Sequence, residues 1–145
     1  MTTIRDLSPL YGAHENRAPN VFAVGWLGAD VPYDCGTVSR AFYDHLKHLM
    51  VDPFQPYVSL GFHKCELCQF DGAMGSRNLF VPTGEFIFVC PELILHYVAT
   101  HRYRPPKAFQ DAVMQCPIPG GAEYRRLFLE SGGRALMELS TPAEL

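Results

Sequence analysis

The sequence has no long apolar run and no strong excess of charge. Its 145 residues include 12 basic and 15 acidic side chains, which give a formal charge of −3 and a pI near 6.0. This balance lacks the electrostatic footprint of a nucleic-acid-binding protein. No segment approaches the roughly 18 apolar residues of a membrane span. Residues 1–6 do not begin a basic and then apolar leader, so no signal peptide is expected.

Cysteine is sparse, and its number is odd. The chain has five cysteines, and two of them, Cys65 and Cys68, have a spacing typical of metal ligands. A disulfide framework of the secreted type is therefore disfavoured, and a reduced, cytoplasmic location is expected. Hydrophobic residues make up 48% of the chain, which is ordinary for a globular fold.

Local patterns predict a small α+β fold with one domain. Residues 1–20 contain Pro, Gly and Asn without periodicity, so we expect an irregular N-terminal lead-in before a single zinc-stapled domain over 21–145. The predicted content is a zinc knuckle, a β-hairpin or small antiparallel sheet, and three to four helices. Apolar runs and turn residues predict strands over 21–27, 57–62, 78–81 and 85–89, the last two forming a hairpin, and helices over about 37–50, 91–102, 106–116 and 122–130.

Two short motifs carry most of the chemical information. Residues 63–68 read His-Lys-Cys-Glu-Leu-Cys, an H-x-C-x-x-C pattern, and residues 96–101 begin and end with histidine. Two thiolates and two imidazoles form a complete tetrahedral shell for zinc, with no position left for a substrate. The sequence therefore predicts a structural Zn²⁺ site made by Cys65, Cys68, His96 and His101.

The order of the predicted elements supports this site. A strand leads into the Cys65–Cys68 knuckle, a hairpin follows, and a helix then presents both histidines, as in Cys2His2 zinc sites with a longer insert. Residues five apart on a helix differ by about 140° in direction. This angle is tolerable where His101 lies in the last turn. His63, next to the knuckle, is a rival ligand that could replace His96, or it is a surface histidine or a hydrogen-bond donor to a ligand.

Other uses of the cysteines fit less well. A redox dithiol would begin a helix, but Gly72 and Gly75 follow the knuckle too closely. Haem attachment needs histidine where Gln69 stands, and the zinc deaminase signature is absent. Cys90 precedes Pro91 at a predicted helix start and is either a reactive thiol, a spare ligand or a buried strand-end residue.

The chain resembles an uncharacterised family of small bacterial proteins, a domain of unknown function with an HxCxxC…HYxxxHxYxPP pattern. The resemblance covers roughly residues 20–118, and the matching segments are 24–27, 61–68, 75–82, 91–98 and 101–106. It implies bacterial cytoplasmic proteins that share the cysteine and histidine pattern, and it carries no established activity.

Three functions remain open at this point. The favoured one is a non-catalytic protein-interaction module of the immunity or accessory type, whose partner is another protein. The enzyme reading, a zinc-dependent hydrolase, needs a general base from Glu66, Asp71 or Glu92, and no motif selects one. Nucleic-acid binding would use the basic residues of the C-terminal third and is disfavoured by the net charge. Those basic residues are Arg102, Arg104, Lys107, Arg125, Arg126 and Arg134, and the aromatic candidates for partner contacts are Tyr97, Tyr103, Phe109 and Tyr124.

Overall fold

The computed structural model describes residues 5–9, 20–56, 63–68 and 74–139, which form five helices and five short strands. The strands are β1 Val21–Ala23, β2 His63–Lys64, β3 Met74–Gly75, β4 Asn78–Pro82 and β5 Ile87–Pro91. The helices are α1 Arg40–Leu49, α2 Ile94–His101, α3 Lys107–Gln115, α4 Ala122–Glu130 and α5 Arg134–Leu139. The predicted α+β class is confirmed.

A small mixed sheet lies at the centre of the fold. Strand β5 is its middle strand, pairing antiparallel with β4 and parallel with β1. All residues of β4 and β5 are buried, and all except Asn78 are apolar, as expected for strands covered on both faces. Strands β2 and β3 form a separate antiparallel pair in which His63 lies opposite Gly75.

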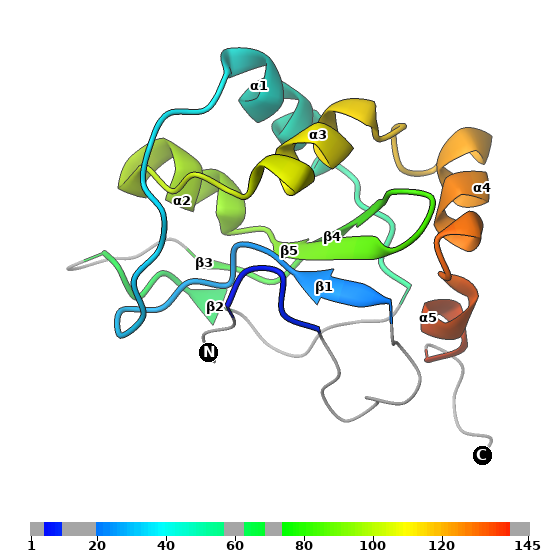
Figure 1. The fold of residues 1–145 in the computed structure, drawn as a ribbon, viewed down its shortest axis with the longest axis horizontal. Helices are drawn as coiled ribbons and strands as arrows, with labels where there is room; N and C mark the ends of the chain where they lie inside the picture. Colours follow the sequence, from blue (N-terminus) through cyan, green and yellow to red (C-terminus); the bar gives the residue numbers. More distant parts are fainter. Residues whose placement is uncertain (1–4, 10–19, 57–62, 69–73, 140–145) are drawn as a thin grey trace.

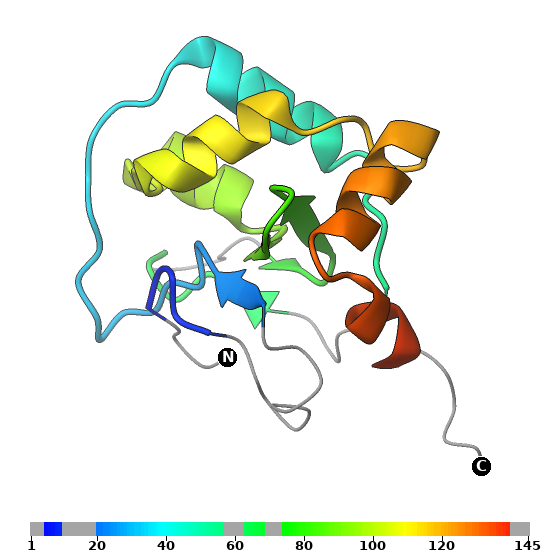
Figure 2. The same cartoon turned by 45° about the vertical axis from the view of Figure 1, so that its right-hand side comes forward.

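Helices cover one face and one end of this sheet. Figure 1 shows α1, α2 and α3 stacked on one side of the β1-β5-β4 sheet, while α4 and α5 stand at one end. The turned view in Figure 2 keeps this separation. Phe42 of α1, Phe88 of β5 and Phe109 of α3 pack edge to face where these layers meet. None of the helices in the described part of the chain is long and apolar enough to cross a membrane.

Several predicted elements are confirmed at shifted boundaries. The hairpin over 78–89 is present, with Gly84 at a φ of +106° in its turn. Ser39 caps α1, because its side chain accepts a hydrogen bond from the Phe42 amide at 3.0 Å. The strand predicted over 21–27 is shorter, ending at Ala23. The strand predicted over 57–62 lies outside the described residues.

The start of α2 was predicted wrongly. Pro91 does not begin this helix; it is the last residue of β5, opposite Asn78, and α2 begins at Ile94. Proline is tolerated at this point because β1, the other neighbour of β5, pairs no further than Val89.

The structure also contains a fifth helix, α5, where the sequence predicted three to four helices. It follows the glycines after α4, and the periodicity of the sequence did not indicate it.

Candidate metal centre

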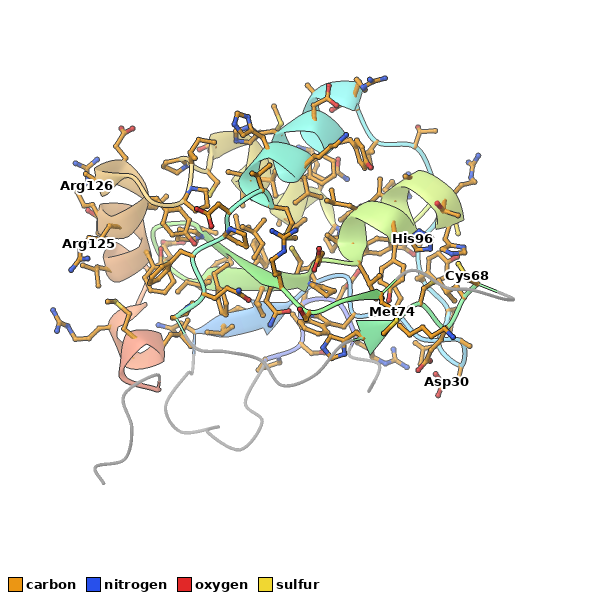
Figure 3. The ribbon with its side chains drawn as sticks, turned by 180° about the vertical axis from the view of Figure 1, so that it is seen from behind. Asp30, Cys68, Met74, His96, Arg125 and Arg126 are labelled. Atoms are coloured by element: carbon orange, nitrogen blue, oxygen red, sulfur yellow. The ribbon has the colours of Figure 1, made fainter. Side chains whose placement is uncertain are left out.

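The four cysteine and histidine side chains predicted as ligands lie together. One ligand atom from each of Cys65, Cys68, His96 and His101 can be chosen so that all four atoms lie within 4.8 Å of one another. Figure 3 shows Cys68 and His96 at the end of the molecule opposite α4. No other group of three or more such side chains is found among the residues that the structure describes.

Two elements supply these four residues. The cysteines lie in the turn that follows β2, where two intervening residues return the chain so that both thiols face α2. The histidines come from the first and last turns of α2, and Arg102, at a φ of 56°, ends the helix directly after His101. The wide helical spacing is accommodated, because the two imidazole rings still approach to 4.9 Å between centroids.

The distances between the donor atoms match those of a tetrahedral metal shell. Sγ of Cys68 lies 3.2 Å from Nε2 of His96 and 3.4 Å from Nε2 of His101. Sγ of Cys65 lies 3.4 Å from the same His101 atom. Usual Zn–S and Zn–N bond lengths place sulfur and nitrogen ligands about 3.6 Å apart. The donor set therefore fits a metal ion of the size and softness of zinc.

Burial sets the protonation preferences of these groups. Cys65 is 2% exposed, while the other three are half-buried. Burial first, and then the neighbouring His101, lowers the pKa of His96, which favours the neutral imidazole that binds metals. Burial is also the main cause that raises the pKa of the Cys65 thiol. A bound cation would have to displace that proton, so metal binding is expected to release protons.

Hydrogen bonds from the loop before α1 support the centre. The hydroxyl of Tyr33 donates to the carbonyl oxygen of His101 at 3.1 Å. The amide of Ala29 donates to the carboxylate of Glu66, inside the knuckle, at 3.3 Å. Sequence reasoning missed Tyr33 because it lies 68 positions before His101 in the chain. No local motif marks a contact of this kind.

The rival ligand His63 is not part of the four-residue cluster. Its ring instead packs edge to face on Trp26, with centroids 5.5 Å apart. Burial lowers the pKa of His63, and its Nε2 atom has no hydrogen-bond partner among the described residues. The geometry gathers His96 with the cysteines and holds His63 against Trp26.

The remaining cysteines are not members of this cluster. Cys90 is fully buried in β5, and burial strongly raises its thiol pKa. This environment matches the buried strand-end reading of Cys90, because a reactive thiol needs a lowered pKa. Cys116 is also buried, with a pKa raised to about 12, whereas Cys35 is exposed.

Two of the three candidate general bases have other partners. Glu66 accepts the Ala29 amide. Glu92 accepts the amides of Ser76 and Arg77 at 3.1 Å and binds the Arg77 guanidinium at 2.9 Å. The Arg77 side chain is the main cause that lowers the pKa of Glu92. Asp71 lies outside the described residues.

The basic residues of the C-terminal third are divided between the two ends of the molecule. Arg102 follows His101 at the metal centre, whereas Arg125 and Arg126 project from α4 at the opposite end (Figure 3). Lys107 pairs with Asp111 on its own helix. Arg102 therefore does not share one basic patch with Arg125 and Arg126.

Comparison with known proteins identifies a family and no function. No curated protein and no solved structure matches the chain. One family model, described as Domain of unknown function (DUF7919), matches residues 2–114 and thus includes both metal-ligand motifs. The suspected resemblance to a domain of unknown function is therefore confirmed, and the chain belongs to this DUF7919 family.

Proposed function

We propose that this chain is a zinc-binding, non-catalytic protein-interaction module, in which Cys65, Cys68, His96 and His101 hold a structural Zn²⁺ ion. The observation that carries the proposal is the cluster of four donor atoms within 4.8 Å. Two thiols with two imidazoles suit zinc better than calcium or magnesium, which prefer oxygen ligands. Four protein ligands also complete the tetrahedral shell of a structural site.

The metal would join two distant parts of the chain. The knuckle and α2 come from either side of the β4–β5 hairpin, so one ion would fix the helix against the turn that follows β2. The apolar core from β1 to α5 is continuous, which supports one zinc-stapled domain over 21–145. Stabilisation of the fold is therefore the role proposed for the metal, within a cytoplasmic protein.

The hydrolase alternative has less support. A catalytic zinc site keeps one position for water and a carboxylate within reach. Glu66 and Glu92 are instead hydrogen-bonded to backbone amides, where they hold loops together. The exposed surface is thus the remaining place for a function, and binding of another protein is the simplest use of it.

Metal analysis tests the structural site. We expect about one zinc ion per chain in protein purified without added metal. Cobalt substitution should give the absorption of a tetrahedral site with two thiolate ligands. Cys68→Ser and His96→Ala should each lose this signal, while His63→Ala and Cys35→Ser should retain it. Retention by His96→Ala with loss by His63→Ala would reject the proposed ligand set.

The interaction role requires a separate measurement. The intact protein, immobilised with its metal, should retain a specific protein from the native host, and the purified pair should form a stoichiometric complex. If no stable complex forms and the metal-loaded protein instead hydrolyses a substrate, the interaction module would be rejected in favour of the hydrolase.

A further inference from the structure

A small cavity lies at the end of the fold opposite the metal centre. Its volume is about 190 Å³, and it is formed by the segment after α1, the start of α4 and the inner side of α5. The lining residues are Phe54, Gly120, Gly121, Ala122, Tyr124, Arg125, Phe128 and Met137. We call this the α4–α5 pocket.

Aromatic rings make the pocket apolar. Phe54 packs edge to face on Phe128, with centroids 5.3 Å apart, and on Tyr124 at 6.2 Å. Phe54 nevertheless remains 37% exposed. The Tyr124 hydroxyl donates to the carbonyl of Phe80 in the core, which satisfies its polar end. The pocket is therefore lined by ring surface, and Phe54 leaves apolar area uncovered.

Two glycines bring α5 over this ring cluster. Gly132 has a φ of +93°, which favours glycine, and the chain turns back there after α4. A Cβ atom on Gly133 would lie 2.2 Å from Cε2 of Phe128, so only glycine allows this close approach. The reversal lets Met137 complete the wall of the pocket. The shape is thus built into the backbone.

One cationic side chain lies at the edge of the pocket. Arg125 is exposed, lines the pocket, and forms no ion pair with any acidic side chain that the structure describes. Its neighbour Arg126 instead lies 4.0 Å from Glu130 on the same helix. Both arginines project from α4 in Figure 3. The pocket therefore combines an apolar interior with one available positive charge.

The volume indicates what the pocket can hold. A cavity of about 150 Å³ is known to accept a single benzene ring. Pockets for whole small-molecule ligands are larger, at about 300–1,000 Å³. A cavity of about 190 Å³ therefore suits one anchor side chain of a protein partner better than a free cofactor.

We propose that the α4–α5 pocket binds an aromatic or large aliphatic side chain of a partner protein whose adjacent carboxylate pairs with Arg125. This inference rests on the proposed role as an interaction module and names the chemistry of its partner. Apolar anchors placed in pockets, with charged groups at the rim, are typical of interface hot spots. A basic partner segment would meet repulsion from Arg125.

Matched peptides test this chemistry on the intact, metal-loaded protein. The probes are the acetylated, amidated tetrapeptides Gly-Phe-Glu-Gly, Gly-Phe-Gln-Gly and Gly-Phe-Lys-Gly, titrated into ¹⁵N-labelled protein. We expect the glutamate peptide to shift the amide signals of Gly120, Gly121 and Ala122 and to bind about tenfold more tightly than the glutamine peptide. The lysine peptide should bind most weakly.

A pair of adjacent arginines provides the control. Arg125→Gln should remove the preference for glutamate over glutamine, while Arg126→Gln should leave it unchanged. Both side chains are exposed, so neither variant should unfold, and the spectra themselves check this. Equal binding of the three peptides, shifts elsewhere in the protein, or no shifts at about 10 mM peptide would overturn the pocket.

The outcome separates this inference from the function on which it rests. If the protein contains one zinc ion per chain but binds none of the peptides, the pocket proposal is rejected and the zinc-site proposal is retained. Peptide binding by protein that never contains zinc would support the pocket and reject the proposed zinc site. A native partner whose affinity is the same for wild type and Arg125→Gln would retain the interaction module and reject this surface.

Discussion

Sγ of Cys68 lies 3.2 Å from Nε2 of His96, although 28 positions separate the two residues in the chain. This contact joins the turn after β2 to the first turn of α2 and encloses the β4–β5 hairpin. A crosslink that closes a loop of this length lowers the conformational entropy of the unfolded chain. By the loop-entropy estimate used for disulfides, this raises the free energy of unfolding by about 3–4 kcal/mol. A metal bound here would stabilise the fold by a comparable amount.

Removal of the metal should therefore lower the melting temperature. For a chain of this size, 1 kcal/mol shifts Tm by about 2–4 °C, so chelation should lower Tm by about 6–16 °C. Differential scanning calorimetry with and without a strong zinc chelator measures this change. The Cys68→Ser variant should melt near the chelated wild type and respond little to the chelator. If complete metal removal leaves Tm unchanged, the metal does not stabilise the fold.

The cysteines should differ in their reactivity toward a thiol reagent. Cys35 is exposed and should react first at pH 8. Burial raises the pKa of Cys116 to about 12 and that of Cys90 still further, so the reactive thiolate is scarce at both positions. Cys65 and Cys68 should become reactive only after chelation. Mass spectrometry of labelled peptides gives the order, and early labelling of Cys90 would contradict it.

The cysteine and histidine cluster was predictable because its motifs are local. A knuckle with two intervening residues and a helix carrying histidine at both ends can be recognised without the fold. The four residues predicted from these motifs are the four that lie together. The packing of His63 against Trp26 could not be predicted from sequence, because it is a long-range contact.

The start of α2 was not predictable for a related reason. Proline before an acidic residue usually indicates the beginning of a helix, and Pro91-Glu92 has that pattern. The glutamate instead binds the backbone and side chain of Arg77, which continues the pairing of β5 with β4. A tertiary contact thus overrides a local signal. The parallel pairing of β1 with β5 had no local signal at all.

The Glu92 and Arg77 pair should make stability depend on acid pH. The Arg77 hydrogen bond holds the pKa of Glu92 below its usual 4.5, so this contribution is present above about pH 4.5 and is lost as the pH falls through the folded-state value. Glu92→Gln should cost about 1–2 kcal/mol at pH 7 and less at pH 3. Urea unfolding at both values measures the difference. The exposed Glu85→Gln serves as control, and an equal loss at pH 3 would contradict the expectation.

The approach of Gly133 to Phe128 should make this glycine indispensable to the α4–α5 end of the fold. Gly133→Ala would place a Cβ atom 2.2 Å from Cε2 and 2.6 Å from the carbonyl oxygen of Phe128, so α5 must move. We expect a loss of stability of about 1–3 kcal/mol, as in other overpacked sites, together with weaker peptide binding in the pocket. Gly121→Ala is the matched control for stability, because its Cβ atom would meet only the Ile118 carbonyl oxygen at 3.6 Å. Thermal unfolding of both variants decides the matter: equal stability would mean that α5 does not pack on Phe128. Because the metal centre is at the opposite end of the molecule, zinc content should stay unchanged in both variants.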